Sequence, residues 1–235
     1  MKKLFLLSAM GALFASVNAQ LSPVINEFSI NHVGSDTEEY VELFANAGFD
    51  FSTFRILEIE GDASSQGTID EVITPGTADA SGFWTALLAT DALENGSVTL
   101  LLVSNFTGAL GNDLDTNNDG VFDVTPWGNI LDSIGISDGG AGDFTYSSVV
   151  LIPSFDGGTN TVGGASRIPN GVDTDSVSDW MRNDFDLAGI PGFTGTPVVG
   201  EALNTPNAVN QAVPEPATLA ALGLGAMALI RRKRK

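Results

Sequence analysis

Short runs of alternating apolar and polar residues, separated by turns, are the main pattern of residues 20–210. In the run 38–45, Val41, Leu43 and Ala45 alternate with more polar positions, and this period of two is typical of a strand with one buried face. Run 96–105 is apolar on both faces, which predicts a central strand. Strands are predicted over residues 23–31, 38–45, 54–60, 96–105, 130–136 and 145–152, while 84–93 fits a short helix or a strand. The pattern predicts an all-β antiparallel sandwich with long loops.

The N-terminal residues have the pattern of a secretory signal peptide. Lys2 and Lys3 precede an apolar run over 4–17, and small residues follow it. We therefore expect residues 1–19 to be removed by cleavage between Ala19 and Gln20.

The C-terminal residues 211–235 contain three ordered parts. A box of Pro214, Glu215 and Pro216 is followed by an apolar run over 217–230. A basic stop then consists of Arg231, Arg232, Lys233, Arg234 and Lys235. As a helix the apolar run spans about 21 Å, which is short for a hydrocarbon core of about 30 Å. The pattern favours one short transmembrane helix used transiently; a simple tail anchor and a buried apolar helix are the alternatives.

This order resembles the PEP-CTERM sorting tail of Gram-negative envelope proteins. The resemblance implies that a membrane-embedded exosortase recognises the box at Val213–Pro216 and cuts nearby, while the basic stop stays on the cytoplasmic side. It also implies export, transient attachment to the inner membrane, and delivery of the body to the cell surface or extracellular matrix, as in a biofilm.

Without its two ends the chain is strongly acidic. The whole chain has 29 Asp and Glu and 10 Lys and Arg; the ends hold Glu215 and seven of the bases, which leaves 28 acids and three bases, a net charge near −25. The remaining bases are Arg55, Arg167 and Arg182, and we expect Arg167 and Arg182 to form structural ion pairs. Such a surface repels nucleic acid and anionic lipid and favours divalent cations. We therefore expect no nucleic-acid partner, and membrane contact only through the tail before processing.

Residues for catalysis are scarce. The chain has no cysteine, which excludes disulfides, thiolate metal sites and a cysteine nucleophile. Its one histidine, His32, cannot form the usual zinc triad and is expected to be solvated or to cap a turn. Glu27, Glu39 and Glu42 are expected at the rim of the sandwich or bonded to backbone, and the three tryptophans are expected in core packing rather than in a sugar-binding platform.

Several motifs together resemble the lamin-tail domain, an immunoglobulin-like β-sandwich. They are the sequences at 25–27, 39–44, 166–171, 179–180 and 205–210. Asn207 stands where the family often has Gly. The resemblance implies a lamin-tail-like sandwich over residues 20–210, with insertions.

Loop 113–126 has oxygen-bearing side chains at the alternating positions of a calcium-binding loop. Around Gly120, which permits a sharp turn, the predicted ligands are Asp115, Asn117, Asp119, the Val121 carbonyl and Asp123, with Asp113 or Asp132 as a completing carboxylate. Pro126 stands where an EF-hand has its bidentate Glu, so the loop is more similar to dockerin or thrombospondin-type loops. An Asx-rich surface turn without metal is the alternative. Bound calcium would be structural, because it would cancel the repulsion between the carboxylates.

We therefore expect an exported, non-enzymatic protein that binds or scaffolds, with an exopolysaccharide or another matrix protein as partner. The alternative is a secreted calcium-dependent hydrolase that uses Asp or Glu. A concave site containing a carboxylate of raised pKa would favour the enzyme.

Overall fold

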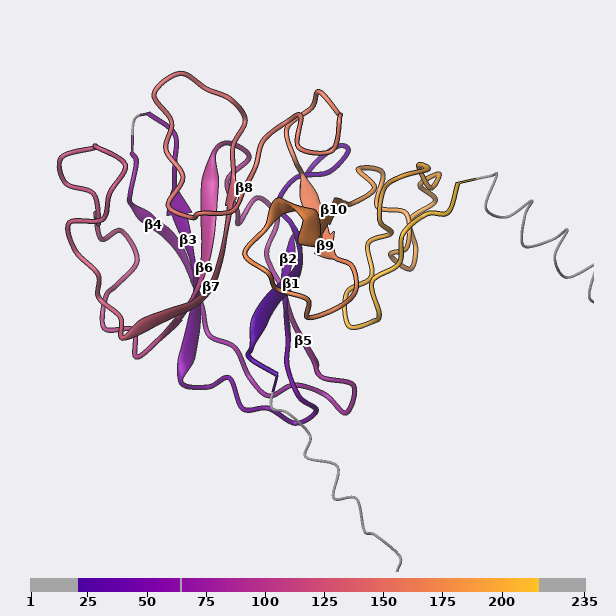
Figure 1. Cartoon of the computed structure of the whole chain (residues 1–235), viewed down its shortest axis with the longest axis horizontal. Coiled ribbons are helices and arrows are strands. Elements are labelled where there is room, and N and C mark those ends of the chain that lie inside the picture. Colours follow the sequence, from indigo (N-terminus) through magenta and orange to yellow (C-terminus); the bar gives the residue numbers. More distant parts are fainter. Residues whose placement is uncertain (1–20, 64, 216–235) are drawn as a thin grey trace, which may run out of the picture.

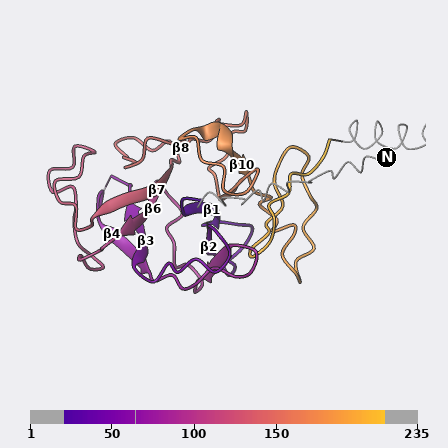
Figure 2. The ribbon, with the colours of Figure 1, turned by 60° about the horizontal axis from the view of Figure 1, so that its bottom comes forward.

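The computed structural model describes residues 21–63 and 65–215, which form two five-stranded β-sheets (Figures 1 and 2). The expected signal peptide, the apolar run 217–230 and the basic stop lie outside these residues. The first sheet has the order β10 (Trp180–Arg182), β9 (Gly164–Arg167), β1 (Val24–Ser29), β2 (Tyr40–Phe44) and β5 (Phe83–Leu87). The second has the order β4 (Ile69–Ile73), β3 (Phe54–Glu60), β6 (Val98–Ser104), β7 (Asn129–Ile136) and β8 (Val150–Leu151). A 3-10 turn at Val177–Asp179 leads into β10.

The main apolar core lies between the two sheets. Ile25 and Val41 from the first sheet belong to the same buried cluster as Ile56, Leu100 and Ile134 from the second. The alternating pattern of each strand places these side chains on one face. The predicted β-sandwich architecture is therefore confirmed at this level.

Irregular chain covers the outer face of each sheet. On the second sheet, Leu57 and Leu101 pack with Leu114 from the loop between β6 and β7. On the first sheet, Tyr40 packs with Leu187 and Ile190 from the chain that follows β10. Figure 1 shows these coverings at the left and right of the two sheets. β6 is apolar on both faces because one faces the core and the other faces Leu114 and its neighbours.

The strand predictions hold for much of the body, but one predicted strand is too long and three observed strands, β4, β9 and β10, were not predicted. The ambiguous run 84–93 begins as strand β5, paired with β2. The predicted strand 145–152 is too long: only Val150–Leu151 pairs, parallel to β7, and the Tyr146 N–H bonds to the Thr99 side chain instead. β4 was not predicted, because Asp70 and Glu71 interrupt its apolar pattern.

A buried ion pair joins the sheets. Arg167 of β9 donates to both carboxylate oxygens of Asp132 of β7 at 3.0 Å, and its guanidinium lies 4.5 Å from the ring centroid of Trp180. The bulge at Asn26 shifts the register of β1, and the neighbouring Ile25 donates its N–H to Asp132 and accepts from Arg167. Arg167 is a structural ion-pair residue, as expected from the sequence.

Among the described residues, none of the helical segments is long and apolar enough to span a bilayer.

Arg167→Met is expected to lower the free energy of unfolding by about 3–5 kcal/mol, because it leaves the buried Asp132 carboxylate without its cation. Urea denaturation followed by tryptophan fluorescence would measure the loss. The control is Arg55→Met in β3 of the second sheet. Arg55 bonds only to the carbonyls of Ser52 and Phe54 among the described residues, so its loss should cost about 1 kcal/mol or less. Equal losses in the two variants would contradict the importance of the ion pair.

Candidate functional site

Two buried carboxylates lie on the outer face of the first sheet. Glu27 of β1 and Glu42 of β2 are both 0 % exposed. Glu27 accepts hydrogen bonds from the Tyr40 hydroxyl at 2.6 Å and the Asn183 amide at 3.1 Å. Glu42 accepts from the Asn26 amide at 2.9 Å. Expected as rim or backbone-bonding groups, these acids are not at the rim, because later chain covers them.

That later chain is the C-terminal segment, residues 202–213. The Thr205 N–H donates to Glu27 at 2.8 Å, and the Asn207 N–H donates to Glu42. The Asn210 amide donates to the backbone carbonyls of Asn26 and Arg167. The expected backbone bonding of Glu27 and Glu42 is thus present, and it binds the C-terminal segment to the sheet.

Burial changes the titration of this network. It raises the pKa of Glu42 to about 8, and the negative charge of Glu27 adds to the shift. Burial also raises the pKa of Glu27, while its hydrogen bond from Tyr40 acts in the opposite direction. The pKa of the buried Tyr40 hydroxyl is raised well above its usual value, so the hydroxyl remains a donor at neutral pH.

The motifs that resemble the lamin-tail domain meet in this network. Asn26 accepts from the Gly171 N–H, and Asn170 accepts from the Asn210 N–H. Asn207 has a φ of 63°, in the left-handed region that Gly favours and Asn tolerates. Asn at this position is therefore compatible with the backbone conformation.

Glu39 and His32 organise backbone near the other end of the first sheet. Glu39 is buried and accepts from the N–H groups of Ala92 and Leu93. His32 is 3 % exposed, and its Nε2 accepts from the Glu38 N–H at 3.1 Å. The capping role expected of His32 is present, but its side chain is buried rather than solvated.

The predicted calcium loop is closed around one carboxylate. Asp115 is fully buried, and its oxygens accept from the N–H groups of Asp119 and Gly120 and from the Tyr146 hydroxyl at 2.9 Å. Gly120 has a φ of 83°, so the sharp turn expected there is present. These donors satisfy Asp115 without a cation.

The other predicted calcium ligands of the loop differ from Asp115 in their exposure to solvent. The side chains of Asp113, Asn117, Asp119, Val121 and Asp123 are exposed. Asp123 accepts from the Thr116 hydroxyl. Asp132 does not join the loop, because Arg167 and Ile25 occupy its oxygens. Calcium binding by this loop stays a prediction.

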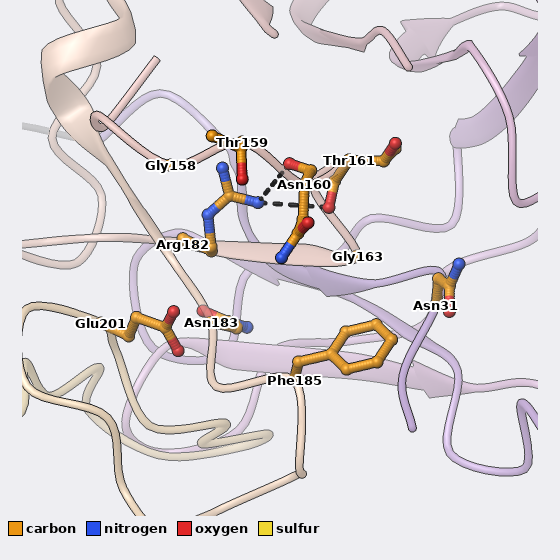
Figure 3. A pocket seen from close by; sticks show the side chains of 10 residues that line it. All are labelled: Asn31, Gly158, Thr159, Asn160, Thr161, Gly163, Arg182, Asn183, Phe185 and Glu201. Atoms are coloured by element: carbon orange, nitrogen blue, oxygen red, sulfur yellow. Dashed lines mark hydrogen bonds between the residues drawn. The ribbon is translucent and has the colours of Figure 1, made fainter. Parts of the chain in front are cut away.

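A pocket of about 360 Å³ lies beside β10 and was not predicted (Figure 3). Its walls carry the amides of Asn31 and Asn160, the hydroxyl of Thr159, the ring of Phe185 and the carboxylate of Glu201. The sequence offered one signal, because Phe185 is a large apolar residue between two aspartates. In the structure its side chain is 48 % exposed.

Arg182 lies in this pocket as a structural group. Its guanidinium donates to Asp156 and to the carbonyls of Pro153, Asn160 and Thr161. These bonds, and stacking over Phe155 at 5.3 Å, fix the chain between β8 and β9 against β10. Arg182 therefore shapes the pocket while its charge is already paired with Asp156.

The predicted sorting signal starts where the body ends. The Val213 N–H donates to the Glu201 carbonyl at 2.8 Å, and the side chains of Pro214 and Glu215 are exposed. Pro216 and the basic residues lie outside the described part of the chain.

Comparison with known proteins agrees with the prediction of a sorting signal at the C-terminus. Residues 212–235 match the model of the PEP-CTERM protein-sorting motif. The chain carries a PEP-CTERM sorting signal. The motif implies export through the membrane, sorting by an exosortase, and a surface or extracellular destination. No curated protein and no solved structure matches the chain significantly.

The buried glutamates predict a fold that loses stability as pH rises from about 4.5 to 8. The folded state holds a proton on Glu42 that the unfolded chain releases near pH 4.5, so raising the pH through this window favours unfolding. Urea midpoints measured in EDTA at about pH 5 and about pH 8 would show a lower midpoint at the higher pH.

Glu42→Gln is expected to reduce this pH dependence, because it removes one titrating group and keeps the side-chain shape. Asp175→Asn, which removes an exposed carboxylate, is the control and should keep the wild-type dependence. Midpoints that are equal at both pH values in the wild-type protein would refute the assignment.

Proposed function

We propose that this protein is an exported, non-enzymatic binding or scaffolding module of the cell envelope or extracellular matrix of a Gram-negative bacterium. Its body would be a lamin-tail-like sandwich, which the meeting of the resembling motifs in one hydrogen-bonded network supports. The exosortase would act on an already folded body.

The observation that carries this proposal is the position of the sorting box. The last body hydrogen bonds in the described chain join Val213 to Glu201 and Gly200, and Pro214 follows at once. Cleavage near the box would therefore remove at most the two backbone bonds of Val213 and would leave the hydrogen bonds of the two sheets intact. A scaffold released in this way keeps its fold.

The pocket beside β10 is the proposed ligand site. Its amide and hydroxyl groups can hydrogen bond to hydroxyl-rich ligands, and Phe185 offers an exposed aromatic face. The body's net charge near −25 disfavours an anionic polymer. A neutral exopolysaccharide is the ligand class that fits both properties.

We also keep calcium at loop 113–126 as part of the proposal. Asp113, Asp119 and Asp123 belong to the same loop as the buried Asp115 and are exposed to solvent. A bound cation would reduce their mutual repulsion and stabilise the cover of the second sheet.

A hydrolase remains the second candidate because Glu201 lines the pocket and its pKa is raised. Burial is the main cause, and the negative charge of Asp184 adds to it. A raised pKa suits a general acid, although glycoside hydrolysis usually needs a second carboxylate at a suitable distance.

Intact mass spectrometry of the protein from its native host should show loss of the chain from about Val213 onward, with the body outside the inner membrane. Replacing Pro214 and Glu215 by Ala should leave the full-length chain in the inner-membrane fraction. The control is Gln211→Ala, an exposed change outside the Pro-Glu-Pro box, which should be processed normally. A wild-type protein that retains its C-terminus in the inner membrane would identify a tail anchor instead.

Phe185→Ala should weaken binding to neutral polysaccharides on a glycan array about tenfold, because it removes the aromatic face of the pocket. Val209→Ala, which removes an exposed apolar side chain outside the pocket, is the control and should bind as wild type. Hydrolysis of any arrayed glycan that is lost in Glu201→Gln would favour the enzyme over the binding protein.

A further inference from the structure

A second acidic site lies at the edge of the second sheet, apart from loop 113–126. Glu60 of β3, Asp70 of β4 and Glu94 of the chain between β5 and β6 each present a carboxylate oxygen, and these oxygens all lie within 4.8 Å of one another. Oxygens bound to one calcium ion at 2.3–2.6 Å can be separated by up to about 5 Å. The three groups are therefore close enough to share a single ion.

Glu58 provides an independent observation. It is 0 % exposed, its Oε1 accepts from the Glu94 N–H at 2.8 Å, and its Oε2 has no hydrogen-bond partner in the described structure. A buried carboxylate oxygen without a partner is costly. A cation bound beside it would supply the missing interaction.

The strand geometry directs Glu58 toward the acidic group. Glu58 and Glu60 are two residues apart on β3, so their side chains lie on the same face. The register of β3 and β4 shifts beside Glu58, which leaves Asp70 as an extra residue at the bulge.

The backbone around Glu94 is fixed in place. Glu39 from the first sheet accepts from the N–H groups of Ala92 and Leu93, and Glu58 from the second accepts from the next N–H, that of Glu94. Two carboxylates from opposite sheets thus hold three consecutive backbone donors. Glu94 is positioned before any ion binds.

The surroundings suit a hydrated divalent cation. A pocket of about 670 Å³ adjoins the group, and its described lining contains Ser65, Asp91 and Asn95 as well as the acids, with no basic residue among them. The volume leaves room for water ligands, and irregular coordination by several carboxylates suits calcium better than magnesium.

A neighbouring acidic group does not share these properties. Asp62, Asp138 and Asp143 also lie close together, but each accepts a hydrogen bond from Ser97 or from a backbone N–H. None of these side chains has a buried oxygen without a partner.

We propose that Glu58, Glu60, Asp70 and Glu94 bind a structural calcium ion that fastens the chain between β5 and β6 to the second sheet. The ion would join residues from three separate segments of the chain and would stabilise the folded state by mass action.

The test uses protein purified from the host that sorts it, stripped with EDTA and titrated with calcium chloride by calorimetry, with thermal melting in parallel. Wild type should bind calcium and melt at a higher temperature when it is present. Glu60→Gln with Asp70→Asn should lose this site, and Glu94→Gln, a change at an exposed side chain, should weaken it about tenfold or more. Asp119→Ala, in loop 113–126, should keep it.

The variant Glu58→Gln tests whether Glu58 is a metal ligand or only a structural buried acid. Without calcium the variant should melt at a temperature no lower than that of wild type, because the buried carboxyl group whose Oε2 has no partner among the described residues is removed; with calcium its gain in melting temperature should be smaller than that of wild type. Absence of calcium binding by wild type at about 1 mM would overturn the proposal. A calcium affinity equal to that of wild type in both Glu94→Gln and the folded Glu60→Gln, Asp70→Asn variant would also overturn it.

Discussion

The attachment of the C-terminal segment to the first sheet depends on two carboxylates that have no cation. Glu27 and Glu42 accept hydrogen bonds from Thr205 and Asn207, and these bonds close the outer face of the sheet. Hydrogen bonds to ionised acceptors are stronger than neutral ones, but burial opposes ionisation. The fold therefore balances strong donors against the cost of removing negative charge from water.

The same balance recurs through the molecule because the body has only three arginines for 28 acids. Arg167 pairs with three carboxylates and holds two carbonyls, and Arg182 pairs with Asp156 and holds three carbonyls. Elsewhere, as at Glu39 and Asp115, backbone N–H groups take the place of cations. Glu58 differs, because one of its oxygens has no hydrogen-bond partner within residues 21–63 and 65–215.

Local pattern was sufficient to predict most of the strands and the two-sheet architecture. It could not predict the burial of Glu27, because the covering partner, Thr205, lies 178 residues away. The short β8 and the missed β4 have the same cause: long-range pairing, rather than the local alternation, decides where each strand exists. The pocket beside β10 could not be predicted from local sequence either, because Asn31, Asn160 and Phe185 come from separate loops. The sorting signal was predictable because it is read as linear sequence.

The contact between Glu27 and Thr205 also has a consequence for the order of events during export. Contacts between distant residues form slowly, since a long loop must close first. A chain that emerges from its N-terminal side exposes β1 early and residue 205 late. The hydrogen-bonded cover of the first sheet therefore cannot form until nearly the whole body has crossed.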